Sequence, residues 1–130
     1  MNDNKTLIEL EFDGLPPTVN QMYRNVTRGG FTCRYKTPAC HDFQDMLSTK
    51  IKRLWAKQPP YDGRVALFIK FLQHDRRRWD IDNRVKSLQD CLSVAGAIKD
   101  DSQIDFLQVE RVYKTKRDVT LLRLEMFVPL

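Results

Sequence analysis

The chain has 130 residues, of which 42% are hydrophobic and 30% are charged, a composition typical of one compact globular domain. Its 22 basic and 17 acidic residues give a formal net charge of +5, which favours a polyanionic partner. No apolar run is long enough to cross a bilayer, and the polar start, residues 1–5, does not resemble a signal peptide. We therefore expect a cytoplasmic protein without a membrane partner.

The first half of the chain predicts a strand, a long loop and a helix. Thr6 to Phe12 alternates between apolar and acidic residues in its second half, which predicts a half-buried strand. Residues 18–36 are polar, basic and aromatic, and predict a mobile loop with Gly29 and Gly30 at its tip. Thr37 followed by proline predicts the start of a helix that continues to about residue 57. The apolar stripe of that helix comprises Phe43, Met46, Leu47, Ile51 and Leu54.

The second half predicts three strands and one helix. Val65 to Leu72 is a nearly continuous apolar run, which predicts a strand buried on both faces. A helix is expected from Asp80 to Gly96, where the glycine is a typical C-terminal stop. Phe106 to Tyr113 and Val119 to Val128 predict two strands, which we expect to form an antiparallel hairpin. The order β-α-β-α-β-β predicts an α+β fold: one small domain, residues 1–130, with a mixed β-sheet covered by two helices.

The cysteines predict neither disulfides nor zinc. Cys33, Cys40 and Cys91 are an odd number in irregular spacing, which is typical of free thiols in a reducing compartment. A zinc site would need Cys33 and Cys40 together with His41 and His74. No C-x-x-C or H-x-x-x-H spacing supports such a site.

An acidic stretch in a basic setting is the strongest indication of chemistry. The residues Asp80-Ile-Asp-Asn83 follow Arg76-Arg-Arg78 and precede Lys86 and the pair Asp100-Asp101. Neighbouring carboxylates repel one another unless a cation lies between them. Mg²⁺ prefers oxygen ligands from one or two carboxylates together with substrate phosphate and water. The pattern therefore indicates a divalent metal site beside a phosphate. The sequence contains no Walker-type loop, so we expect no nucleotide cofactor.

Each of these residues also has a structural interpretation, and the residues alone leave both open. Asp80 fits a helix N-cap, and Asp82 fits a first-turn carboxylate that the helix dipole stabilises. Lys86 lies one turn beyond Asp82 and fits an i, i+4 ion pair. The basic clusters fit solvated loops.

The order of these residues resembles the signature of the RusA family of Holliday junction resolvases. The resemblance rests on the sequence Asp75-Arg-Arg-Arg-Trp-Asp-Ile-Asp-Asn83, on Lys86, Asp90, Ala95-Gly96 and Asp100-Asp101, and on Leu15-Pro-Pro-Thr-Val-Asn20-Gln-Met-Tyr-Arg24. It implies a homodimeric endodeoxyribonuclease of phage or prophage origin. Such an enzyme uses Mg²⁺, with Mn²⁺ as a substitute, and makes paired nicks in four-way DNA junctions.

The resemblance also implies roles for individual residues. Asp80, Asp82 and Asp101 match the catalytic metal-binding aspartates, and Lys86 matches the essential lysine. The nucleic-acid-binding residues would be Asn20, Arg24, Arg76, Arg77, Arg78 and Lys86. Asp100 is an accessory acid. Trp79 departs from the pattern, because some relatives carry another arginine there, and its indole is an accessory candidate for stacking on an exposed base.

The length of the predicted helix leaves open how the third carboxylate, Asp101, reaches the site. A helix from Asn83 to Ala95 is about 20 Å long at 1.5 Å per residue, and the steps from Gly96 to Asp101 span at most about 17 Å. Asp101 therefore closes the site either within one chain or across a dimer interface. Two other functions also remain: a non-catalytic branched-DNA-binding module, and a nuclease of broader range that cuts flaps and other branched DNA.

Overall fold

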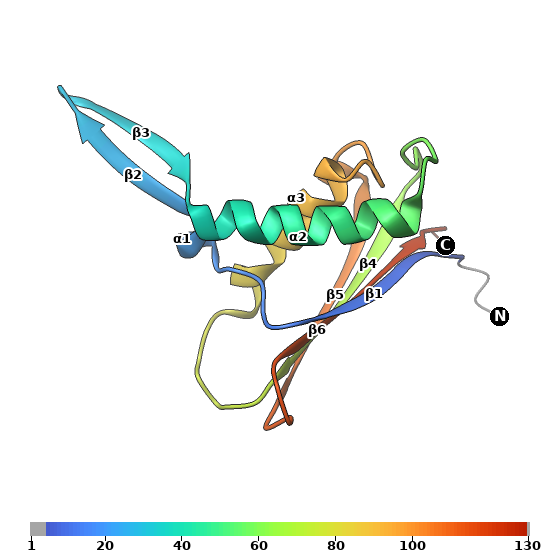
Figure 1. The fold of residues 1–130 in the computed structure, drawn as a ribbon. Helices are drawn as coiled ribbons and strands as arrows, with labels where there is room; N and C mark the ends of the chain where they lie inside the picture. Colours follow the sequence, from blue (N-terminus) through green and yellow to red (C-terminus); the bar gives the residue numbers. More distant parts are fainter. Residues whose placement is uncertain (1–4, 130) are drawn as a thin grey trace.

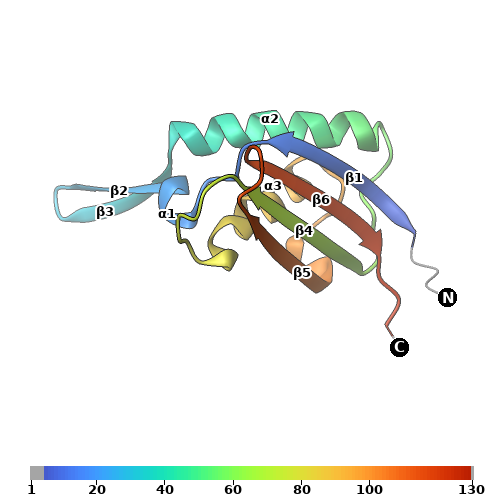
Figure 2. The same cartoon turned by 90° about the horizontal axis from the view of Figure 1, so that it is seen from below.

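The computed structural model describes residues 5–129 and has an α+β fold built on a four-stranded mixed sheet. The strand order is β1-β6-β4-β5. The strands are β1 (Thr6–Asp13), β4 (Val65–Gln73), β5 (Ile104–Tyr113) and β6 (Val119–Met126). Two helices, α2 (Pro38–Trp55) and α3 (Val85–Val94), cover one face of this sheet (Figures 1 and 2). The predicted fold class is confirmed.

Strand pairing differs from the prediction at the C-terminal end. β4 pairs in parallel with β5 and antiparallel with β6, so it lies between them. The expected hairpin of β5 with β6 is therefore wrong. A parallel neighbour needs a crossover connection, and the segment containing α3 supplies it between β4 and β5. β6 then pairs with the other edge of β4 and with β1.

The core lies between the sheet and the two helices. Val65, Leu67, Ile69 and Phe71 of β4 are fully or almost fully buried there. They share a cluster with the helix residues Leu47, Ile51, Leu88 and Leu92. On the opposite face of β4, Lys70 is exposed and Phe68 and Leu72 are only partly buried. The prediction that this strand is buried on both faces is thus correct for one face.

The start of α2 confirms the predicted cap. The Thr37 side chain accepts a hydrogen bond from the Cys40 backbone N–H at 3.2 Å, and Pro38 is the first helical residue. The helix ends at Trp55, which belongs to the core. Met46 and Leu54, two members of the predicted stripe, are instead 43% and 52% exposed.

The helix predicted from Asp80 to Gly96 begins later than expected. A 3₁₀ turn, η1 (Ile81–Arg84), comes first, and α3 begins at Val85. The predicted stop is confirmed, because Gly96 has a φ of +80°, the left-handed conformation that glycine adopts most readily. A second 3₁₀ turn, η2 (Asp101–Gln103), then leads into β5.

The segment predicted as a mobile loop is an ordered hairpin. A short helix, α1 (Val19–Met22), is followed by β2 (Tyr23–Arg28) and β3 (Phe31–Lys36), which pair antiparallel. Gly29 and Gly30 form the two-residue turn with positive φ values of 57° and 84°, the geometry that a tight hairpin turn requires. Figure 1 shows this hairpin extending beyond the end of α2, away from the sheet.

Among residues 5–129, no helix is long and apolar enough to span a membrane.

Candidate active site

A buried glutamine organises the loop that leads from β4 to the acidic stretch. Gln73 is 1% exposed, and its side-chain amide donates to Asp75 Oδ1 and to the Arg77 carbonyl, both at 2.8 Å. Its Oε1 accepts from Trp79 Nε1 at 2.8 Å. All these polar atoms are therefore satisfied although the side chain is buried. Sequence reasoning missed Gln73; the only signal was a polar residue at the end of an apolar strand.

Trp79 packs against the protein. Its ring meets Phe71 edge-on at 5.3 Å between centroids. The guanidinium carbons of Arg84 and Arg111 lie 4.7 Å and 4.6 Å from the ring centroid, and Arg111 also donates to the Trp79 carbonyl at 2.5 Å. These contacts give the partly buried Trp79 a packing role, while the stacking of its indole on a DNA base stays a prediction. Trp79 holds the backbone directly before Asp80.

Asp80 and Asp82 lie in and next to the 3₁₀ turn and are both exposed. Asp80 has the N-cap position, but its side chain makes no capping hydrogen bond. Within residues 5–129, neither carboxylate has a hydrogen bond or an ion pair, whereas Asp75 pairs with Arg77 at 2.8 Å and Asp90 pairs with Lys86 at 3.2 Å. The capping interpretation of Asp80 is therefore wrong, and both carboxylates are available to a cation.

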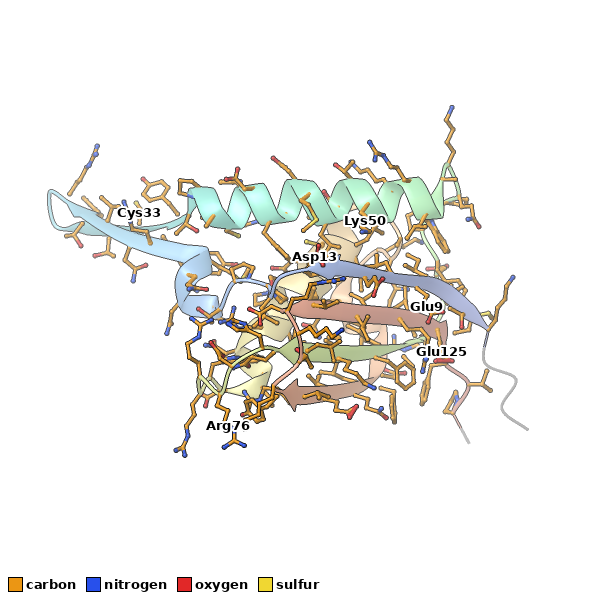
Figure 3. All side chains as sticks on the ribbon, turned by 60° about the horizontal axis from the view of Figure 1, so that its bottom comes forward. Glu9, Asp13, Cys33, Lys50, Arg76 and Glu125 are labelled. Carbon is orange, nitrogen blue, oxygen red and sulfur yellow. The ribbon has the colours of Figure 1, made fainter. Side chains whose placement is uncertain are left out.

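The three arginines lie in the exposed loop before the acidic turn. Arg77 is held by Asp75, and the Gln73 hydrogen bond keeps the pKa of that carboxyl below its usual range, with the Arg77 backbone and side chain acting in the same direction. Arg76 and Arg78 are exposed, and Figure 3 shows Arg76 pointing outward from the loop. Two guanidinium groups are thus presented to solvent close to Asp80 in sequence.

Two contacts join the acidic turn to the N-terminal loop. Asn83 Oδ1 accepts a hydrogen bond from the Val19 backbone N–H at 3.3 Å. Arg84 donates to the Pro16 carbonyl. Asn20 follows Val19 directly and is exposed, as is Arg24 on β2. The structure thus brings together the two sequence segments on which the family resemblance rests, although more than 60 positions separate them.

Lys86 is exposed on α3 and pairs with Asp90 at 3.2 Å, not with Asp82 as the structural interpretation expected. The hydrogen bond with Asp90 raises the pKa of Lys86, and the charges of Asp90 and Asp101 act in the same direction. The ammonium group therefore stays protonated at neutral pH. It also lies within the electrostatic influence of Asp101.

The acidic pair at η2 divides into two roles. The Asp100 carboxylate accepts from the Ser102 backbone N–H at 3.0 Å, which caps the turn, and hydrogen bonding from the Ser102 side chain and backbone lowers the pKa of Asp100. Asp101 is partly exposed and precedes β5, whose first residue pairs with the start of β4. Asp80, in contrast, follows the end of β4.

The structure does not gather the three predicted metal ligands within one chain. No group of three or more His, Cys, Asp or Glu side chains that could hold a metal ion occurs in the described range 5–129. Asp80, Asp82 and Asp101 therefore do not form a closed ligand set, although the charge of Asp101 acts on Lys86, one turn beyond Asp82. Two carboxylates without protein partners still fit Mg²⁺, because this ion commonly takes only one or two carboxylates and completes its shell with phosphate and water.

The fold and the site define a basic α+β domain that presents unpaired carboxylates beside exposed arginines. The model of the family described as Endodeoxyribonuclease RusA matches residues 13–122. The chain therefore belongs to the RusA family of endodeoxyribonucleases, which confirms the resemblance seen in the sequence. Membership implies a nuclease that acts on branched DNA. Comparison with individual curated proteins finds no match.

Proposed function

We propose that the protein is a Mg²⁺-dependent endodeoxyribonuclease that resolves Holliday junctions by paired nicks in DNA recombination and repair. The observation that carries this proposal is the hydrogen bond between Asn83 and Val19, which joins the acidic turn to the asparagine-bearing N-terminal loop. A bare pair of aspartates is common on protein surfaces. Here the two aspartates are followed by Asn83, which bonds to the N-terminal loop, and are preceded by three arginines. This arrangement supports a site for a DNA phosphate.

Asp80 and Asp82 are the proposed metal ligands, because their carboxylates have no protein partner within the described chain. A bound Mg²⁺ supplies Lewis-acid stabilisation of the charge that develops on the phosphate during hydrolysis. Asp101 is the proposed third ligand. Because these carboxylates do not form a closed ligand set within residues 5–129, we propose that movement on DNA binding or a second subunit completes the site.

The cations around the carboxylates hold the DNA. Lys86 keeps its positive charge at neutral pH and is proposed to contact the phosphate that is cut. Arg76, Arg78 and Arg24 are exposed and are proposed to bind flanking phosphates. Each such contact releases counterions, so affinity should fall steeply with salt.

A homodimer is part of the proposal, and the open face of the sheet is the proposed interface. Phe106 is 41% exposed on this face, and its ring lies 5.6 Å from that of Phe68 and 6.0 Å from that of Phe127. A groove of about 430 Å³ runs over the same face. Apolar side chains gathered in this way are typical of an interface.

The charges on this face favour a second copy over DNA. Glu9, Glu11 and Glu110 line the groove and would repel phosphates, while Lys70 and Arg123 line it as well. A surface that carries both signs can complement itself across a two-fold axis. A two-fold axis also gives two equivalent sites for two equivalent strands.

Light scattering after size-exclusion chromatography tests the dimer. The wild-type protein should elute with twice the chain mass, and Phe106→Asp should elute as a monomer. Leu54→Asp, at a residue 52% exposed on α2, is the matched control and should stay dimeric. A wild-type monomer at micromolar concentration would reject this interface.

Cleavage of synthetic DNA tests the activity. The wild-type protein should nick four-way junctions in Mg²⁺ or Mn²⁺, while Asp82→Asn should bind them with similar affinity and leave them uncut. Asp42→Asn, at an exposed aspartate of α2, is the matched control and should cut normally. If Asp82→Asn also unfolds the protein or abolishes binding, Asp82 has a structural role.

The same assay separates the two other functions. Salt-sensitive binding of junctions without nicks in either metal would identify a non-catalytic binding module. Equal cutting of junctions, forks and flaps would identify a branched-DNA nuclease of broader range. The described residues contain no group of three metal ligands, so the assay without nicks must be tested explicitly as evidence for a binding module.

A further inference from the structure

The β2–β3 hairpin has a charge distribution unlike the rest of the molecule. Between Asp13 and Asp42 the chain has no Asp or Glu, and all four Lys and Arg residues of this stretch lie on the hairpin strands. They are Arg24, Arg28, Arg34 and Lys36. Solvated surfaces usually mix both signs of charge. A hairpin that carries only cations favours a polyanion.

The strand register divides the hairpin into two different faces. Directly opposed residues share a face of an antiparallel pair. Arg24 is opposite Tyr35, and Arg28 is opposite Phe31, with the pair Val26 and Cys33 between them. Cations and aromatic rings therefore alternate along this face, which we call the aromatic face of the hairpin.

The other face is polar and its groups already have partners. The Thr27 and Thr32 hydroxyls hydrogen-bond to each other at 2.9 Å. The Arg34 guanidinium carbon lies 3.8 Å from the Tyr23 ring centroid. Lys36 donates to the Gln44 side chain at 3.2 Å. These contacts stiffen the hairpin. On the aromatic face, in contrast, the rings of Phe31 and Tyr35 have no such partner within the hairpin.

The aromatic face exposes large apolar side chains to solvent. Phe31 is 77% exposed next to the glycine turn, and Tyr35 is 56% exposed on the same face. Figures 1 and 2 show that the hairpin projects away from the sheet. Neither α2 nor α3 covers the hairpin beyond its base. Two large rings exposed on one face of a projecting arm are typical of a surface that binds a ligand.

We propose that the aromatic face of the hairpin binds unstacked bases at the branch point of the DNA, with Phe31 stacking on a base. This inference rests on the proposed function and extends it to an element outside the acidic site. Arg24 and Arg28 hold the phosphates on either side of the stacked nucleotides. Aromatic rings interleaved with cations are typical of surfaces that bind single-stranded or splayed nucleotides, because every base offers a π-face.

The position of the hairpin agrees with this role. Its strands begin directly after α1, whose first residue is bonded to Asn83 in the acidic turn. The C-terminal end of β3, at the base of the hairpin, is fixed by Thr37, which donates from its hydroxyl to the Gln21 carbonyl at 2.6 Å and from its backbone N–H to the Met22 carbonyl at 2.9 Å. DNA held by the hairpin is thereby held at a defined place relative to Asp80 and Asp82.

Binding of four-way junctions in EDTA tests the inference without any cleavage. Phe31→Ala should weaken junction binding about tenfold, within the range of base–aromatic stacking, while Phe31→Trp should bind like the wild type. The slope of log affinity against log salt should not change for Phe31→Ala, because no charge is removed. Arg28→Ala should reduce that slope by about 0.9. Thr32→Ala, on the polar face, is the matched control and should bind like the wild type.

Two further measurements report on the bases and on the face itself. The fluorescence of 2-aminopurine at the branch point should rise on binding of the wild-type protein and rise far less with Phe31→Ala. Junction DNA should protect Cys33, which is exposed on the aromatic face, from alkylation.

Junction binding of Phe31→Ala within twofold of the wild type, or unprotected Cys33, would overturn the inference. A changed oligomeric state of Phe31→Ala with unchanged DNA binding would also overturn it and identify a protein contact. These results leave cleavage by the wild-type protein in Mg²⁺ untouched. A wild-type protein that binds through Phe31 but never cuts would instead reject the proposed activity and keep the role of the hairpin.

Discussion

Asn83 Oδ1 accepts a hydrogen bond from the backbone N–H of Val19 at 3.3 Å, across 64 positions of sequence. Val19 is the first residue of α1, whose backbone N–H has no partner within the helix. One amide side chain therefore satisfies a helix terminus and, at the same time, links the N-terminal loop to the acidic turn. This link explains why an asparagine follows the two aspartates.

Replacement of Asn83 tests this link. Asn83→Ala should lower the free energy of unfolding by about 1 kcal/mol, the usual net contribution of one hydrogen bond. Junction cleavage should fall more than this loss of stability explains, because the loop that carries Asn20 is no longer fixed to the acidic turn. Chemical denaturation and single-turnover cleavage measure the two effects. Asn25→Ala, at an exposed asparagine of β2, is the control, and equal effects of both variants would contradict the prediction.

Replacement of Trp79 tests its packing role. Trp79→Phe keeps an aromatic ring near Phe71 but leaves Gln73 Oε1 without its donor in a side chain that is 1% exposed. A buried acceptor without a partner costs about 1–3 kcal/mol, so the free energy of unfolding should fall by that amount. Urea denaturation measures it. A cost below about 0.5 kcal/mol would show that water reaches Gln73 and that the loop is more open.

Replacement of Lys86 separates charge at the phosphate from stability. Lys86→Met removes an exposed i, i+4 ion pair with Asp90, which contributes only about 0.3–0.5 kcal/mol to the free energy of unfolding. Cleavage should nevertheless fall by about 10²–10³-fold, the size expected when a group that stabilises transition-state charge is lost. Asp90→Asn breaks the same ion pair but keeps the cation, so its cleavage should fall far less. Similar losses in both variants would assign the effect to the ion pair.

The contact between His74 and Asp118 predicts a pH dependence of stability. His74 Nδ1 lies 2.6 Å from Asp118 Oδ1, and this hydrogen bond raises the pKa of His74. Burial acts to raise the pKa of Asp118, but the hydrogen bonds from His74 prevail and lower it. Because the folded pKa of His74 exceeds its unfolded value, its contribution is complete below about pH 6.5 and is lost as pH rises through the folded pKa. Thermal unfolding between pH 5.5 and 8.5 should show this loss for the wild type, and His74→Gln should flatten it.

Thiol labelling tests the burial of the cysteines. Cys33 is exposed, whereas Cys40 and Cys91 are buried, and burial raises the pKa of Cys91 to about 12. Thiolates are the reactive form, so one thiol per folded chain should react rapidly with a maleimide at pH 7. All three should react in denaturant. Rapid reaction of a second thiol in the folded protein would show that the contact between α2 and α3 opens.

The sequence correctly predicted those helix and strand boundaries that are set by residues adjacent in the chain. Thr37 and Pro38 start α2 because a hydroxyl acceptor and a residue without an N–H fit the first turn of any helix. Gly96 ends the second helical segment because its positive φ is unfavourable for other residues. The apolar run beginning at Val65 formed a strand, since a short and nearly continuous run of branched and aromatic residues needs no distant partner to be recognised.

The sequence by itself thus determined the fold class, the acidic turn and the family to which they point. Only the tertiary structure decided that β4 separates β5 from β6, that Trp79 packs against Arg84 and Arg111, and that Asp80, Asp82 and Asp101 form no closed ligand set among the described residues. These arrangements depend on contacts between residues far apart in the chain. Such contacts follow from the packing of whole elements, and no local periodicity or spacing encodes them.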